Sequence, residues 1–129
     1  GFFDENFFIY LEETDLCKRL KLKNKKIFLD KNIKINHLGG SSHDKKINFE
    51  MELSRNWHWM WSKFYFNKKH HGYLKAFIYT FPNFISSLFK FIFYLFLNNK
   101  KKRIIYFMRF MGLLNSYLLI RSYYRPYSD

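Results

Sequence analysis

The chain has 129 residues, which is enough for one ordinary domain, and its formal net charge is +13. Such a charge is compatible with nucleic acid, anionic lipid or an anionic substrate as a partner, while an aromatic content of 23% excludes a disordered basic tail. The single cysteine, Cys17, excludes an intramolecular disulfide and fits a reducing compartment.

The first predicted element is a helix over residues 13–22, where apolar side chains recur at helical spacing. Thr14 or Glu13 is expected to cap its start. Glu12, Glu13 and Asp15 fall at its first turn, where free backbone N–H groups and the helix dipole stabilise negative charge. One carboxylate placed there in a cleft can act as a general base toward a hydroxyl group. On spacing alone, capping and solvated charge explain the cluster better.

Two short strands are predicted next, over residues 26–29 and 33–37, the second because its apolar and polar residues alternate. Residues 38–42, with the sequence LGGSS, indicate a flexible loop. His37 then stands at a strand end beside a glycine loop, from where it can bind a metal or a phosphate oxygen. A purely structural histidine is the alternative.

A second helix is predicted over residues 47–67, which contain neither proline nor glycine. Trp57, Trp61, Phe64 and Tyr65 fall on one side of it. Tryptophan and tyrosine beside basic residues are typical of a helix that lies in a membrane interface. Packing of the same aromatic stripe against a protein core is the alternative.

The last part of the sequence indicates a helical hairpin. Residues 76–97 carry a single charge, Lys90, and at ~1.5 Å per residue they are just long enough to span a bilayer core. A basic turn, residues 98–103, follows, and residues 104–120 contain Arg109, a charge that is costly in mid-membrane. A two-span hairpin and a re-entrant pair are both open, and the positive-inside bias favours the re-entrant or interfacial arrangement.

Two segments resemble a known family. Residues 1–19, GFFDENFFIYLEETDLCKR, resemble the GxFDExFFxYxEDxDLCxR signature of family 2 glycosyltransferases, in particular the bacterial rhamnosyltransferase-like enzymes of polysaccharide and cell-wall assembly. Residues 37–42, HLGGSS, resemble the H-x-G-G-S segment of the same family at the expected distance downstream. The resemblance covers residues 1–45, about a third of the chain.

The resemblance implies roles for single residues. Glu13, the second acid of the pair, takes the position of the catalytic base, where the family has the shorter Asp. Glu12 and Asp15 are further catalytic candidates, and Arg19 has a supporting role. His37 is implied to bind a divalent metal, Mg or Mn, or the nucleotide diphosphate. The loop implied to border the diphosphate and the acceptor consists of Gly39, Gly40, Ser41 and Ser42.

The resemblance also implies an activity. Such enzymes transfer a sugar, rhamnose in this subgroup, with inversion from a nucleotide-sugar to a lipid-linked or polysaccharide acceptor in cell-envelope glycan synthesis. The expected location is the cytoplasmic face of the bacterial inner membrane. Family members have a GT-A fold whose first half carries an Asp-x-Asp metal motif, and this sequence has none. The chain is therefore expected to be a C-terminal fragment that is inactive alone.

The predicted fold is α+β, mostly helical, in three regions. Residues 1–46 are expected to form the acceptor-side end of a GT-A catalytic domain, residues 47–71 a basic aromatic amphipathic helix, and residues 72–129 a membrane-associated helical hairpin and tail. A non-catalytic basic membrane-surface module is the alternative, but it gives no reason for the two motifs. No nucleic-acid partner is expected, because residues 76–97 are strongly apolar and no nucleic-acid-binding motif is present.

Overall fold

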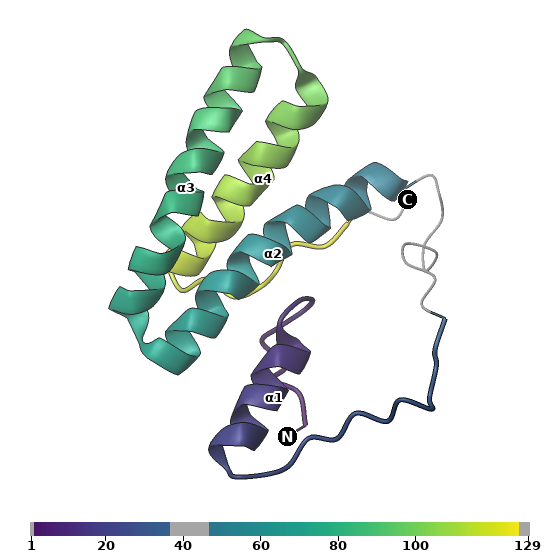
Figure 1. Cartoon of the computed structure of the whole chain (residues 1–129). Helices are drawn as coiled ribbons and strands as arrows, with labels where there is room; N and C mark the ends of the chain where they lie inside the picture. Colours follow the sequence, from purple (N-terminus) through teal and green to yellow (C-terminus); the bar gives the residue numbers. More distant parts are fainter. Residues whose placement is uncertain (1, 37–46, 127–129) are drawn as a thin grey trace.

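Four helices form the regular structure of the computed structural model, which describes residues 2–36 and 47–126. They are α1 (Glu12–Leu22), α2 (Asn48–His71), α3 (Tyr73–Phe96) and α4 (Lys100–Tyr117). Figure 1 shows α3 and α4 side by side, with α2 crossing them obliquely and α1 set apart, next to α2. The segment after α4 runs back along α2. The architecture of the described residues is therefore a helical bundle of α2, α3 and α4 with α1 docked on its side.

The prediction of an α+β fold with a GT-A sheet is wrong for the described residues, which contain no strand. Residues 26–36, where both strands were predicted, are irregular, and the side chains of Phe28 and Ile35 are 85% and 84% exposed. A strand needs a neighbouring strand for its backbone hydrogen bonds. No strand is present among the described residues, so alternation of apolar residues did not produce a sheet.

The helix predictions are confirmed, with shifted ends. The helix predicted over 13–22 is α1, and the one predicted over 47–67 is α2, which continues to His71. Gly72 follows the last residue of α2 with a φ of +84°, which is accessible to glycine without steric cost, and the chain turns there directly into α3. At the start of α4, the Asn99 side chain accepts a hydrogen bond from the Lys102 N–H at 3.1 Å, which caps the helix.

The hydrophobic core lies between α2, α3 and α4. Its buried members are Met60 and Phe64 of α2, Ala76 of α3 and Leu113 of α4. Half-buried aromatic side chains of α3 and α4 pack against it; they are Phe77, Phe84 and Tyr117. Trp57 and Trp61 are buried as well, so the aromatic stripe of α2 packs on protein, which was the alternative to its insertion in a membrane interface.

Gly112 lets α4 approach α2 closely. A Cβ atom built on Gly112 would lie 2.3 Å from the backbone carbonyl oxygen of Trp57, a distance that side-chain carbons do not adopt. The contact is with backbone, so no rotamer change can relieve it. The crossing of α2 and α4 thus depends on a residue without a side chain at position 112.

α3 has an inverted distribution of polarity. Its buried residues are the small or polar Ala76, Thr80 and Ser87, and the two hydroxyl groups donate to carbonyl oxygens one turn earlier in the same helix. Its exposed face is made of large apolar side chains, which include Leu74, Ile78, Tyr79, Phe81, Phe89, Phe93 and Phe96. Small residues toward neighbouring helices and apolar residues outward are the arrangement of helices that face lipid. By length and composition α3 is also the one helix in the described residues that could cross a membrane.

Candidate functional site

The start of α1 is held by backbone geometry and not by a side-chain cap. Tyr10 and Leu11 have φ angles of 72° and 69°, in the left-handed region, and no side chain caps the helix. The predicted cap, Thr14 or Glu13, is therefore wrong. Two neighbouring contacts fix the turn: Phe7 is buried with its ring 4.9 Å from that of Tyr65, and the Ser62 hydroxyl donates to the Ile9 carbonyl oxygen at 2.9 Å.

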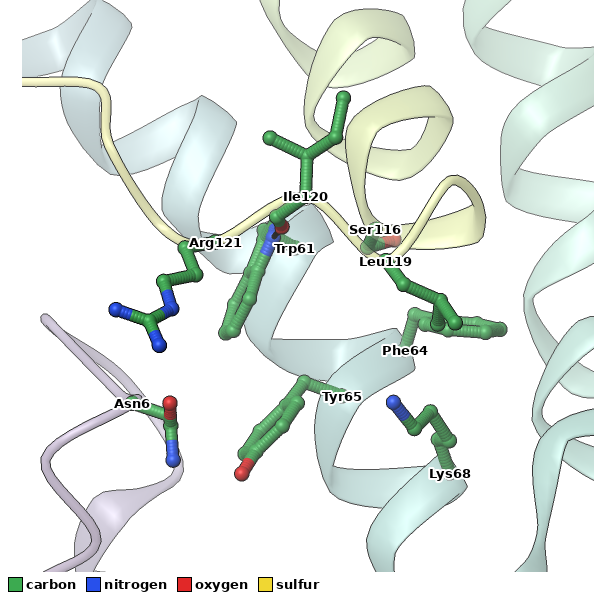
Figure 2. A pocket seen from close by; sticks show the side chains of 9 residues that line it. All are labelled: Asn6, Trp61, Phe64, Tyr65, Lys68, Ser116, Leu119, Ile120 and Arg121. Atoms are coloured by element: carbon green, nitrogen blue, oxygen red, sulfur yellow. Dashed lines mark hydrogen bonds between the residues drawn. The ribbon is translucent and has the colours of Figure 1, made fainter.

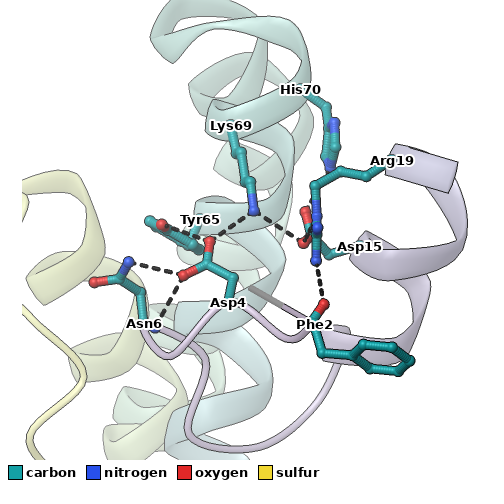
Figure 3. Close-up of polar contacts among 8 residues, drawn as sticks. All are labelled: Phe2, Asp4, Asn6, Asp15, Arg19, Tyr65, Lys69 and His70. Atoms are coloured by element: carbon teal, nitrogen blue, oxygen red, sulfur yellow. Dashed lines mark hydrogen bonds and ion pairs between the residues drawn. The ribbon is translucent and has the colours of Figure 1, made fainter. Parts of the chain in front are cut away.

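Asp15 is the centre of a buried ion cluster between α1 and the C-terminal end of α2 (Figure 3). The carboxylate is fully buried. Its Oδ2 accepts hydrogen bonds from Arg19 Nε at 2.8 Å and from Lys69 Nζ at 2.9 Å, and its Oδ1 lies 2.8 Å from His70 Nε2. Arg19 also donates from Nη2 to the Phe2 carbonyl oxygen at 2.7 Å, which ties the N-terminal segment to the same cluster.

A second carboxylate, Asp4, joins the cluster through Lys69. Lys69 Nζ donates to Asp4 Oδ2 at 2.6 Å, and the Tyr65 hydroxyl donates to the same oxygen at 3.0 Å. The other oxygen of Asp4 accepts from the backbone N–H and the side-chain amide of Asn6 at 3.0 and 2.8 Å. One lysine of α2 therefore bridges two acids that are 11 positions apart in the sequence.

The electrostatics of the cluster favour the ionised state of both acids. Burial alone raises the pKa of Asp15, but hydrogen bonds from Lys69, Arg19 and His70 outweigh it and hold that pKa below its usual range. Asp4 behaves in the same way: burial opposes ionisation, and the hydrogen bond from Lys69 leads the contacts that lower its pKa. A carboxylate with a lowered pKa and three bound donors is a poor proton acceptor, so Asp15 supports the structure and is not suited to be a base.

The two remaining acids of the predicted catalytic set lie differently. Glu13 is exposed on the first turn of α1. Glu12 is half-buried, and its Oε2 atom is buried without a hydrogen-bond partner among the described residues. Of the three predicted catalytic acids, Glu13 is therefore the one whose carboxylate is open to solvent and to a substrate.

The second half of the predicted site lies outside the described residues. This applies to His37, the predicted metal or diphosphate ligand, and to the whole loop of Gly39, Gly40, Ser41 and Ser42. Whether they share a cleft with Glu13 stays a prediction. Within residues 2–36 and 47–126, no three His, Cys, Asp or Glu side chains gather closely enough to hold a metal ion.

Sequence reasoning missed the partners of Asp15 on α2. His70 contacts Asp15, and the neighbouring His71 has its Nε2 atom 2.9 Å from Lys18 Nζ. The available signal was the scarcity of acids, 10 against 23 lysines and arginines. In such a chain a buried acid recruits several cations, but the sequence does not show which ones.

Comparisons with protein families, with curated proteins and with solved structures found no match to this chain. The likeness to family 2 glycosyltransferases therefore depends on the two motifs in residues 1–45 alone.

Proposed function

We propose that this chain carries the base-bearing helix of an inverting glycosyltransferase that works at a membrane surface, with Glu13 as the general base. The observation that supports this assignment is that two acids within one helix turn have different environments. Asp15 is buried and paired with three donors, whereas Glu13 is exposed. The buried cluster fixes the orientation of α1, and a fixed helix is what a precisely placed base requires.

In the proposed reaction, the Glu13 carboxylate accepts the proton of an acceptor hydroxyl group as that oxygen attacks the anomeric carbon. The nucleotide diphosphate leaves from the opposite face, so the configuration inverts and no covalent intermediate forms. A Mg or Mn ion, for which the resemblance implies His37 as a ligand, would supply charge stabilisation to the leaving diphosphate when bound. His37 and the loop of residues 39–42 are proposed to border that diphosphate. Glu13 is one methylene longer than the family's Asp, so its backbone is expected to stand further from the acceptor.

Membrane attachment is proposed from the inverted polarity of α3. Its buried side is small and polar and its outer side is apolar, the reverse of a helix in a water-soluble bundle. Residues 100–103, KKKR, follow its C-terminal end and suit an anionic leaflet. We place the chain at the cytoplasmic face of the bacterial inner membrane, where a lipid-linked or polysaccharide acceptor of cell-envelope synthesis is available. The donor is a nucleotide-sugar, rhamnose being the sugar that the resemblance suggests.

The test is a Glu13→Gln substitution in the intact enzyme, which keeps the size of the side chain and removes its basicity. We expect transfer to fall by about 10²–10⁴-fold while donor binding stays close to normal. Asp30→Asn is the matched control, because Asp30 is an exposed acid outside α1. Donor binding lost together with transfer would make Glu13 a donor-site residue, and unchanged transfer would refute the base assignment.

A non-catalytic membrane-surface module is the second candidate, and the same α3 face favours it. The two candidates differ in one measurement. A module requires that the intact protein, with Glu13 unchanged, binds anionic vesicles and shows no glycosyl transfer. A glycosyltransferase requires both vesicle binding and transfer that depends on Glu13. Full solubility without detergent would contradict the membrane part of both proposals.

A further inference from the structure

A cavity of about 210 Å³ lies between α2 and the segment that follows α4 (Figure 2). Trp61, Tyr65 and Lys68 come from α2, Arg121 comes from the segment after α4, and Asn6 reaches it from the N-terminal loop. Pockets for drug-sized ligands span ~300–1,000 Å³. The cavity is therefore suited to one small group or headgroup and not to a whole nucleotide-sugar.

Two cations at this cavity are not used by the rest of the described structure. Lys68 makes no ion pair with the acids of the described residues, and its ammonium lies 5.9 Å from the centre of the Tyr65 ring. Arg121 likewise pairs with none of those acids. In Figure 2 the two cationic groups lie on either side of Tyr65. The neighbouring Lys69, by contrast, is engaged by two carboxylates.

The aromatic wall of the cavity is fixed. The rings of Trp61 and Tyr65 stack with their centres 4.9 Å apart and an angle of 19° between their planes. Trp61 Nε1 donates to the Ile120 carbonyl oxygen at 2.9 Å, and the Tyr65 hydroxyl donates to Asp4. Because these polar atoms are already satisfied, the wall offers a ligand apolar ring surface, and polar recognition is left to the two cations.

We propose that this cavity binds a phosphate monoester whose organic part rests against the Trp61 and Tyr65 rings. A phosphate monoester carries about −1.5 to −2 charge at pH 7, which two cations match, whereas a carboxylate requires one. The planar guanidinium of Arg121 can hold two phosphate oxygens, and Lys68 adds a point charge. Glu5 lines an adjacent hollow together with Arg121 and opposes binding from that side. This site is independent of the role proposed for Glu13.

Two sources of such a group are possible, a soluble sugar phosphate and a lipid headgroup, and the experiment separates them. The full chain in detergent micelles is titrated calorimetrically with inorganic phosphate and with glucose 1-phosphate. In nanodiscs, binding of the chain to phosphatidic acid is compared with its binding to phosphatidylserine at equal surface charge. Saturation by glucose 1-phosphate identifies the soluble source, and preference for phosphatidic acid identifies the lipid.

The decisive variant is Lys68→Gln with Arg121→Gln, and its control is Lys23→Gln with Lys31→Gln, which removes the same charge from exposed positions. We expect the first pair to weaken binding at least 10-fold and the control to change it less than 2-fold. Lys68→Arg is expected to retain binding, and Glu5→Gln to tighten it 2- to 5-fold. The proposal is overturned by equal weakening in both double variants, or by no binding of any phosphate probe at millimolar concentration.

Discussion

Asp15→Ala is expected to undock α1 from the bundle without unfolding the bundle. The substitution leaves Arg19, Lys69 and His70 around an empty site. Removing one partner of a buried ion pair costs about 3–5 kcal/mol. Arg19 and Lys69 keep 29% and 26% of their side-chain surface exposed, so both regain water. We therefore expect a lower cost, about 2–3 kcal/mol.

Hydrogen exchange measured by mass spectrometry tests this expectation, because it reports each helix separately. A cost of about 2–3 kcal/mol corresponds to a roughly 30- to 150-fold faster exchange of the α1 amides, with α2, α3 and α4 unchanged. Glu13→Ala is the matched control: it removes an exposed acid from the same turn and is worth about 0.3–1 kcal/mol, at most about 5-fold. Equal acceleration in the two variants, or acceleration throughout the bundle, would refute the view of Asp15 as the local anchor of α1.

Two further predictions concern the bundle itself. Gly112→Ala places a methyl group against the Trp57 carbonyl oxygen and is expected to lower the free energy of unfolding by about 1–3 kcal/mol, measured by thermal unfolding. Ser86→Ala is the control and should change stability little. An unchanged melting temperature of Gly112→Ala would show that α2 and α4 can move apart freely. Burial lowers the pKa of His58 to about 4. Because the unfolded chain then binds the extra proton first, stability should fall as the pH drops from about 6.5 toward 4, by about 3 kcal/mol at most. In His58→Gln the unfolding free energy should lose this part of its pH dependence, and persistence of the full slope would contradict the assignment.

Local patterns predicted the helices well and the strands badly, for a physical reason. A helix satisfies its backbone hydrogen bonds within one segment, so apolar spacing and the absence of Pro and Gly were sufficient for α2. A strand satisfies them with another segment, and residues 26–36 show that alternation alone does not create that partner. The prediction of a side-chain cap at the start of α1 was wrong for a related reason. The turn there is held by Phe7 and Ser62, and Ser62 lies 53 positions from its acceptor, the Ile9 carbonyl oxygen.

The candidate site was predictable only in part. The acid cluster and its place at a helix start followed from residues 12–15, but the roles of its members depended on α2. Lys69 and His70 lie 54 and 55 positions from Asp15, and nothing in their own neighbourhood distinguishes them from the other basic residues that end α2. Burial of one acid thus depends on tertiary packing against α2, and the sequence alone did not show which carboxylate would be buried.

Helix geometry nevertheless explains why burying Asp15 leaves Glu13 free. Successive residues turn by ~100° around a helix, so Glu13 and Asp15 point in directions about 160° apart. Glu12 and Asp15 are about 60° apart, and Glu12 is accordingly half-buried. A helix that directs Asp15 into α2 must direct Glu13 outward. The spacing of two positions between these acids is therefore sufficient to combine, within one turn, an anchor that holds the helix and a carboxylate that a substrate can reach.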